Sequence, residues 1–121
     1  MFKKVAFTVY PVTDLQRAQE FYETTLGLAP GNAMGGGKWV EYDLPGGGCF
    51  AITTMLGNVK PSQNAGGSVA LEVEDLTSLT ATLEERGVSF KMPAMDLPTC
   101  KMCVILDSEG NALILHEIKP R

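Results

Sequence analysis

The chain has 121 residues, of which 45% are hydrophobic and 20% are charged, and it carries a formal net charge of −4. A chain of this length and composition is expected to fold as one compact domain around a single core. Fourteen acidic residues against ten basic ones argue against nucleic acid or an anionic membrane as partner, because both require concentrated Lys and Arg. The apolar stretches are far shorter than the ~20 residues that a membrane-spanning helix needs.

The first half of the chain predicts a strand, a helix and three further strands. The helix has apolar residues at helical spacing from Leu15 to Leu26, with Thr13 or Asp14 as its N-cap and Gly27 as its stop. The strand between the helix and the last two strands is poorly marked. The expected strands of this half are Val5–Tyr10, about Gly31–Met34, Trp39–Leu44 and Cys49–Thr54.

The second half repeats this order, because Val12-Thr13-Asp14-Leu15 recurs 61 residues later as Val73-Glu74-Asp75-Leu76. Its helix is expected to begin after Asp75 and to stop at Gly87. A segment with two prolines, from Met92 to Thr99, is expected to be an irregular loop, and the methionines near it are expected to fill the core or loops. The expected strands of this half are Ser68–Val73, about Ser89–Met92, Met102–Leu106 and Ala112–Ile118.

The repeat predicts an α+β fold of two tandem βαβββ modules within a single domain, residues 1–121. Module one covers about residues 1–56, a linker about 57–67, and module two about 68–121. Each module is too small to bury its own sheet, so the two are expected to pack together.

The three cysteines are an odd number, which fits a reducing compartment, so the cytoplasm is the expected location. Cys100 and Cys103 match the C-x-x-C spacing but run into the strand-like Val104-Ile105-Leu106. Residues i and i+3 on a strand face opposite sides, so this pair is expected to form small buried side chains rather than a redox pair.

Two motifs resemble those of a known family. They are Val12-x-Asp14-Leu15 with Phe21-Tyr22 and Leu26-Gly27-Leu28, and the turn Asp107-Ser108-Glu109-Gly110-Asn111. With the internal repeat, they resemble the vicinal oxygen chelate superfamily, which includes glyoxalase I, bleomycin-resistance proteins and extradiol dioxygenases. The resemblance implies a cup-shaped mixed sheet with a ligand cavity, and a homodimer.

The resemblance also implies where metal ligands would lie in members that use a metal: on the first and last strand of each module. Those positions are occupied here by Phe7, Ala51, Ser68 and Ile114. Only Ser68 offers an oxygen, and a weak one, so no cofactor is expected. A divalent metal is conceivable only at a non-standard site.

Strand alternation indicates which side chains would line the cup. Glu41, Glu72 and His116 are the candidate catalytic residues, because two carboxylates and one imidazole in a partly buried site can transfer protons. Each also has a plainer interpretation: Glu41 facing water, Glu72 in an ion pair or a dimer interface, and His116 at the solvent edge. The candidate ligand-binding residues are Phe7, Val9, Trp39, Thr53, Ser68 and Ile114.

Two functional hypotheses follow, beside a plainer one in which the cup is vestigial. The first is a glyoxalase- or bleomycin-resistance-like protein that binds a small apolar or aromatic molecule in the cup without the usual metal. The alternative is a lyase or isomerase of the glyoxalase superfamily. It would use Glu41, Glu72 and His116 for acid–base chemistry or in a shifted metal site.

Overall fold

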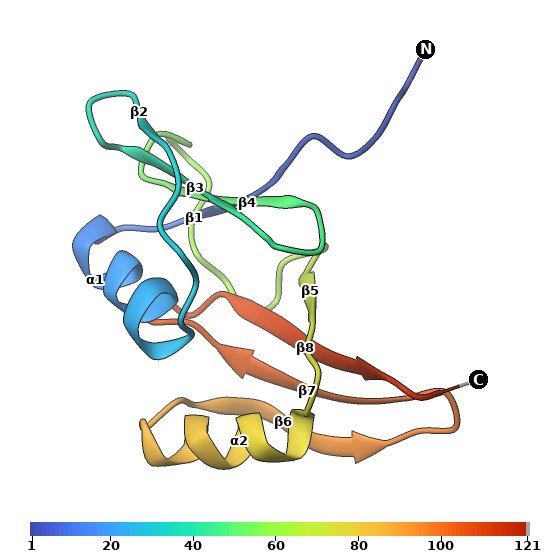
Figure 1. The fold of residues 1–121 in the computed structure, drawn as a ribbon. Coiled ribbons are helices and arrows are strands. Elements are labelled where there is room, and N and C mark those ends of the chain that lie inside the picture. The colour runs from blue at the N-terminus through green and yellow to red at the C-terminus, as the bar shows by residue number, and fades with distance from the viewer. Residues whose placement is uncertain (121) are drawn as a thin grey trace. The chain divides into compact units, whose positions relative to one another are not determined.

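The computed structural model describes residues 1–120, and the chain divides into two compact units, Met1–Pro61 and Ser62–Arg121 (Figure 1). The first unit contains β1 (Thr8–Pro11), α1 (Leu15–Gln19) continued by the π-helical segment η1 (Glu20–Thr25), β2 (Ala33–Met34), β3 (Trp39–Asp43) and β4 (Cys49–Thr53). The second contains β5 (Val69–Glu72), α2 (Leu76–Glu85), β6 (Phe90–Asp96), β7 (Cys100–Leu106) and β8 (Ala112–Ile118). The predicted α+β fold of two βαβββ modules is confirmed.

The two units have the same sheet topology. The strand order is β1-β4-β3-β2 in the first sheet and β5-β8-β7-β6 in the second. In each, the first strand of the unit pairs in parallel with the last, and the other pairs are antiparallel. Both sheets are therefore mixed, and the two halves related by the sequence repeat have the same strand order and strand directions.

The repeated aspartates cap the two helices, as the sequence predicts. Asp14 accepts a hydrogen bond from the backbone N–H of Arg17, and Asp75 from that of Ser78, each at 3.1 Å. The structure thus selects Asp14 over Thr13 as the first N-cap. Gly27 has φ +79° and Gly87 has φ +76°, so each chain reversal uses a conformation that L side chains rarely adopt.

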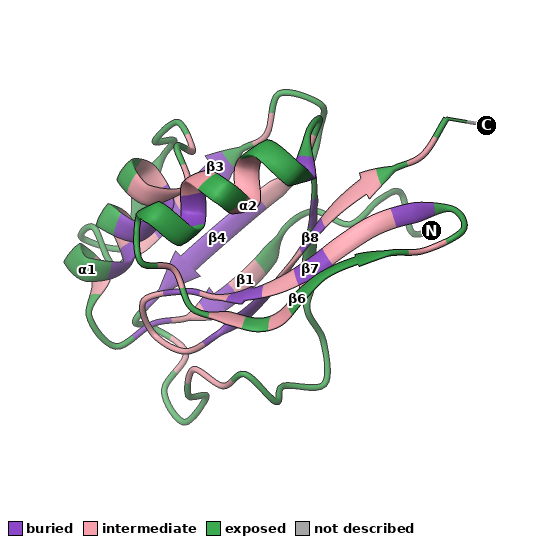
Figure 2. Cartoon of the chain, turned by 90° about the horizontal axis from the view of Figure 1, so that it is seen from below, coloured by how far each residue is buried: buried purple, intermediate pink, exposed green. Residues whose placement is uncertain are grey.

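Each sheet packs one face against the helix of its own unit. In the first unit the ring of Tyr22, on η1, lies 5.1 Å from that of Phe50 and 6.0 Å from that of Tyr42. In the second unit, Leu76 and Leu83 of α2 are buried, as are Ile105, Leu113 and Leu115 of the sheet. Figure 2 shows buried residues along the strands and exposed residues on the outer sides of the helices. We call the face of each sheet that is turned away from its helix the open face.

The turn between β7 and β8 explains the second family-like motif. Asp107 Oδ1 accepts hydrogen bonds from the N–H groups of Glu109 and Asn111, both at 2.8 Å, and Gly110 has φ +87°. The Asn111 side chain donates to Asp107 Oδ2 at 3.0 Å and accepts from the N–H of Ser62 at 3.2 Å. These contacts hold the turn between β7 and β8 in place.

The limits predicted for β1, β6 and β7 are wrong, and β7 begins at Cys100 rather than Met102. β1 begins at Thr8 rather than Val5. Thr8 pairs in parallel with Phe50, so Val5 and Ala6 fall opposite residues that precede β4 and have no strand to pair with. The segment expected to be an irregular loop from Met92 is strand β6 as far as Asp96. β6 is the edge of its sheet and has irregular register on both sides of Met92, and these are places where a sheet tolerates Pro93.

Across residues 1–120, every helix falls short of the length and apolarity needed to cross a membrane.

Candidate functional site

The open face of the first sheet carries Trp39 and Glu41, because Val40 and Tyr42 between them are buried on the helix side. The strand register places Val9 and Glu41 on either side of Ala51, and Trp39 opposite Thr53. These residues therefore share one face, as strand alternation predicts.

Glu41 is held by its neighbour on the same face. The indole Nε1–H of Trp39 donates to Glu41 Oε2 at 2.9 Å, and the ring of Phe7 meets Trp39 edge to face with centroids 5.2 Å apart. Phe7 and Glu41 line a cavity of about 390 Å³ together with Lys4, Asp43 and Cys49, among others. Burial, followed by the charges of Glu41 and Asp43, raises the pKa of the Cys49 thiol, which therefore stays protonated at neutral pH.

Thr53 is fully buried, and its hydroxyl is used by the backbone. It donates to the carbonyl of Lys38 at 2.7 Å and accepts from the N–H of Met55 at 2.9 Å. Thr53 also borders a smaller cavity of about 190 Å³, between the end of β1 and the segment after β4. The Thr53 hydroxyl therefore holds the segment after β4 in place.

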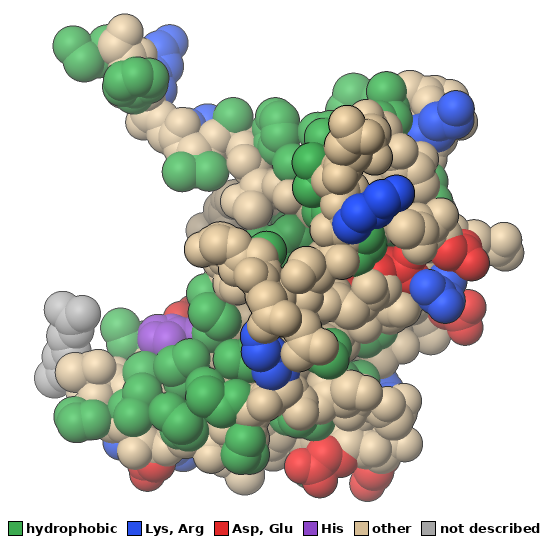
Figure 3. All heavy atoms as spheres, turned by 180° about the vertical axis from the view of Figure 1, so that it is seen from behind, with side chains coloured by type: hydrophobic (Ala, Val, Ile, Leu, Met, Phe, Trp, Pro, Cys, Tyr) green, Lys and Arg blue, Asp and Glu red, His purple; other side chains and the backbone are tan. Residues whose placement is uncertain are grey.

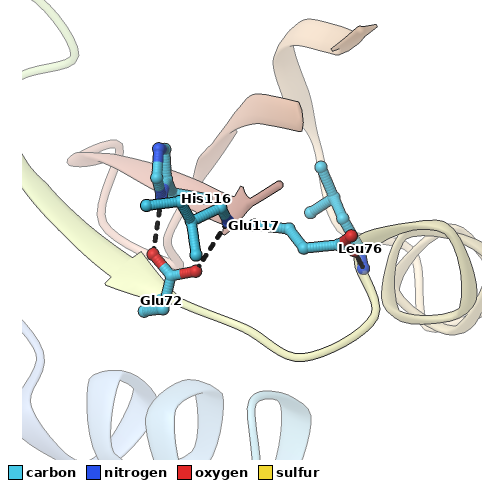
Figure 4. A network of polar contacts seen from close by, with 5 residues as sticks. Glu72, Leu76, His116 and Glu117 are labelled. Carbon is cyan, nitrogen blue, oxygen red and sulfur yellow. Dashed lines mark hydrogen bonds and ion pairs between the residues drawn. The ribbon is translucent and has the colours of Figure 1, made fainter. Parts of the chain in front are cut away.

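The open face of the second sheet holds a pair that combines two candidate catalytic residues. Glu72 on β5 lies directly opposite His116 on β8, and Glu72 Oε1 is 2.6 Å from His116 Nδ1. The other carboxylate oxygen accepts the backbone N–H of Ile118 at 2.8 Å (Figure 4). The hydrogen bond to His116, and next that from Ile118, lower the pKa of Glu72. Both oxygens of this exposed carboxylate are thus engaged by β8.

The neighbouring residue Glu117 points to the opposite face. Its Oε1 accepts the backbone N–H of Leu76, the first residue of α2, at 2.7 Å (Figure 4). Glu117 therefore adds a second carboxylate to the N-terminus of α2, where the helix dipole favours negative charge. Sequence reasoning missed this role, because nothing local relates residue 117 to residue 76.

The surroundings of the Glu72–His116 pair are apolar. The register places Met102 opposite His116 and Met95 opposite Met102, all on the same face. The next row across the sheet is formed by Ala70, Ile114, Val104 and Met92. Figure 3 shows the imidazole bordering a group of hydrophobic side chains. In these two rows of the sheet, Met95 is exposed. The other apolar side chains named are half-buried, apart from Ala70: Met92, Met102, Val104 and Ile114.

Sequence reasoning missed the contribution of β6 and β7 to this face. Alternation along β7 could have identified Met102 and Val104, since Cys103 and Ile105 are the buried residues that flank them. Met92 and Met95 gave no such signal, because the register of β6 shifts between them. The predicted ligand-binding Ile114 lies in this face, whereas Ser68 is exposed just before β5.

The positions at which the family resemblance implies metal ligands do not fit a metal. Phe7 packs on Trp39, Ala51 is fully buried and Ile114 is a hydrocarbon, so only the Ser68 hydroxyl could contribute. Within residues 1–120, the structure brings no three His, Cys, Asp or Glu side chains together as a metal site. Glu72 and His116 meet in the second unit, while Glu41 belongs to the first.

Comparison with known proteins agrees with this architecture. The family model described as Glyoxalase/Bleomycin resistance protein/Dioxygenase superfamily matches residues 4–115. The chain belongs to this superfamily. No curated protein matches the chain.

Three solved structures have a similar fold. TnmS3, an antibiotic binding protein from Streptomyces sp. CB03234, has a TM-score of 0.82 at 21% identity, with 98% of each chain covered. A glyoxalase/dioxygenase from Nostoc punctiforme has a TM-score of 0.77 at 15% identity, with 98% of this chain and 92% of that one covered. A lactoylglutathione lyase from Agrobacterium tumefaciens has a TM-score of 0.70 at 17% identity, covering 94% and 92%.

These likenesses establish the fold alone. The same superfamily fold serves an antibiotic binding protein and a lyase, so function must be argued from the side chains of this chain's own faces.

Proposed function

We propose that this superfamily member binds a small apolar or aromatic molecule and does so without the metal that the family resemblance implies. The observation that carries the proposal is the open face of the second sheet. There, Met102, Val104 and Ile114 are only half-buried around a single polar pair. A contiguous accessible apolar surface with a few fixed polar groups is typical of a small-molecule site.

Two further observations support the proposal. At three of the four metal-ligand positions, Phe7, Ala51 and Ile114, the side chains are hydrocarbons that cannot bind a metal, and Phe7 packs against Trp39. The antibiotic binding protein TnmS3 has the same fold over nearly the whole of both chains. We infer that the ligand of this chain is likewise a small organic molecule.

The uncharged fluorescent compound N-phenyl-1-naphthylamine tests this proposal by equilibrium titration. We expect saturable binding to the wild type, weakened about tenfold by Met102→Gln, which places an amide on the open face at nearly constant volume. The matched control is Met55→Gln, because Met55 is exposed and lies outside both sheets. Equal affinity of the wild type and Met102→Gln, or no binding at all, would contradict the proposal.

A second candidate function, a lyase or isomerase, is favoured by the Glu72–His116 pair. A carboxylate that orients an imidazole is a frequent element of acid–base catalysis. The third candidate catalytic residue of the sequence hypothesis, Glu41, lies in the first unit. Turnover of a 2-oxoaldehyde–thiol adduct that falls at least a hundredfold in Glu72→Gln would establish it. A rate unchanged by Glu72→Gln would remove the pair from any mechanism.

We also propose that the two units form a single domain, with residues 57–67 as linker between modules, and that the chain acts as a homodimer in the cytoplasm. The sequence repeat supports the division into modules, the family resemblance supports the homodimer, and the odd number of cysteines supports a reducing compartment. Sedimentation equilibrium would test the dimer, and a monomer at micromolar concentration would contradict it.

A further inference from the structure

The His116 ring is held in one orientation and in one tautomer. An ionised carboxylate can only accept hydrogen bonds, so the 2.6 Å contact between Glu72 Oε1 and His116 Nδ1 places a proton on Nδ1. Glu72 cannot rotate away easily, because its second oxygen accepts the N–H of Ile118. In the neutral imidazole, Nε2 is then an acceptor.

Within residues 1–120, this acceptor has no protein partner. Among residues 1–120, Glu72 is the only hydrogen-bond partner of the His116 side chain, whose surface is 31% exposed. The residue opposite His116 on the other side is Met102, whose thioether has no proton to donate. An acceptor placed on an apolar face loses free energy when a ligand covers it, unless that ligand supplies a donor.

From this geometry we infer the ligand's chemical class, an inference that rests on the proposed function. We propose that the open face of the second sheet selects flat aromatic molecules bearing a hydroxyl, and that His116 Nε2 accepts a hydrogen bond from this hydroxyl. The aromatic ring lies over Met102, Val104 and Ile114, since methionine sulfur and branched aliphatic groups pack well against rings. Glu72 is a positioning residue, because both of its oxygens are already engaged.

Two compounds with the same ring separate the hydroxyl from the apolar contact: 2-naphthol, which can donate, and 2-methoxynaphthalene, which cannot. The buffer lies above the pH range in which histidines ordinarily titrate and below that in which the naphthol ionises. The wild type is expected to bind 2-naphthol about fivefold more tightly, the usual effect of one neutral hydrogen bond. In His116→Phe the ratio falls to about one, while 2-methoxynaphthalene binding is kept.

The outcomes distinguish this inference from the proposed function. Equal wild-type affinities for the two compounds overturn the hydroxyl selection and leave the apolar site intact. If neither compound binds, both the hydroxyl selection and the proposed function are overturned. Retention of the fivefold ratio in His116→Phe places the hydroxyl contact elsewhere and also refutes the inference.

The positioning role of Glu72 has its own spectroscopic test, because His116 is the only histidine. In the wild type, ¹⁵N chemical shifts of the ring are expected to report the Nδ1–H tautomer, with the Nε2 resonance moving when 2-naphthol binds. In Glu72→Gln the side-chain amide can donate as well as accept, so the tautomer becomes mixed and the naphthol ratio falls.

Glu74→Gln is the matched control, since it removes the same charge from an exposed residue just beyond β5. It should leave the tautomer and the ratio unchanged. If Glu72 has a purely structural role, Glu72→Gln weakens the binding of both compounds equally and leaves the affinity ratio at fivefold. This result would refute the positioning role of Glu72.

Discussion

Gly31 lies where the backbone of one segment approaches that of another, and Gly31→Ala should therefore destabilise the protein. A Cβ at this position would lie 2.3 Å from the carbonyl oxygen of Glu41 and 3.1 Å from its carbon. The neighbouring Asn32 carbonyl accepts the N–H of Glu41 at 2.9 Å. The two segments can separate only if the hydrogen bond between Asn32 and Glu41 lengthens, so relieving the clash also weakens this bond.

The cost follows from these contacts. Overpacking against a fixed neighbour costs about 1–3 kcal/mol, and weakening one backbone hydrogen bond adds about 1 kcal/mol. Alanine lowers the conformational entropy of the unfolded chain, which offsets the loss of stability by about 0.5–1 kcal/mol. We expect a net loss of about 2 kcal/mol in the free energy of unfolding, equivalent to a decrease of about 8 °C in Tm for a chain of this length.

Urea unfolding followed by the fluorescence of Trp39, the only tryptophan, measures this loss. Gly46→Ala is the matched control, because a Cβ there meets nothing within 4 Å and the residue has no positive φ. The control should be neutral or slightly stabilising. If Gly31→Ala costs no more than Gly46→Ala, the close approach of the two backbones is refuted.

Two further predictions concern pH and cooperativity. The N–H and hydroxyl of Ser78 lower the pKa of Asp75, so its contribution to stability is complete above the ordinary carboxyl range and disappears as the pH falls through the lowered pKa. Asp75→Asn should thus be less stable than the wild type at neutral pH, and urea unfolding should show the gap closing as the pH falls below the ordinary range of an aspartate; a constant gap would contradict this. If the two units form one domain, Trp39 fluorescence and far-ultraviolet circular dichroism should give the same urea midpoint, and separate midpoints would show independent units.

The elements of this fold were predictable wherever their cause is local. Asp14 and Asp75 each precede a helical pattern and cap it, and a glycine ends each pattern in the left-handed conformation. The limits of β1 and β6 were not predictable, because each depends on how far the partner strand extends. Pro93 in particular suggests a loop until the edge position of β6 is known.

The site divides in the same way. Alternation along a strand is local, so it placed Trp39 and Glu41 on one face, and the bond between them is an i, i+2 contact. The contact between Glu72 and His116 joins residues 44 apart, and it depends on the parallel register of β5 and β8. Which candidate residues meet is therefore decided by strand pairing, which no local pattern determines.

The central claim is that a small apolar molecule binds on the open face of the second sheet, and the methionines allow a direct test. Of the six, Met92, Met95 and Met102 lie in the rows of this face, whereas Met1 and Met55 are exposed elsewhere. With ¹³C-methyl methionine labelling, titration with 2-methoxynaphthalene should shift the three methyl resonances of this face saturably and leave those of Met1 and Met55 unchanged. Saturable shifts confined to Met1 or Met55, or no shift in any methyl resonance, would contradict the account.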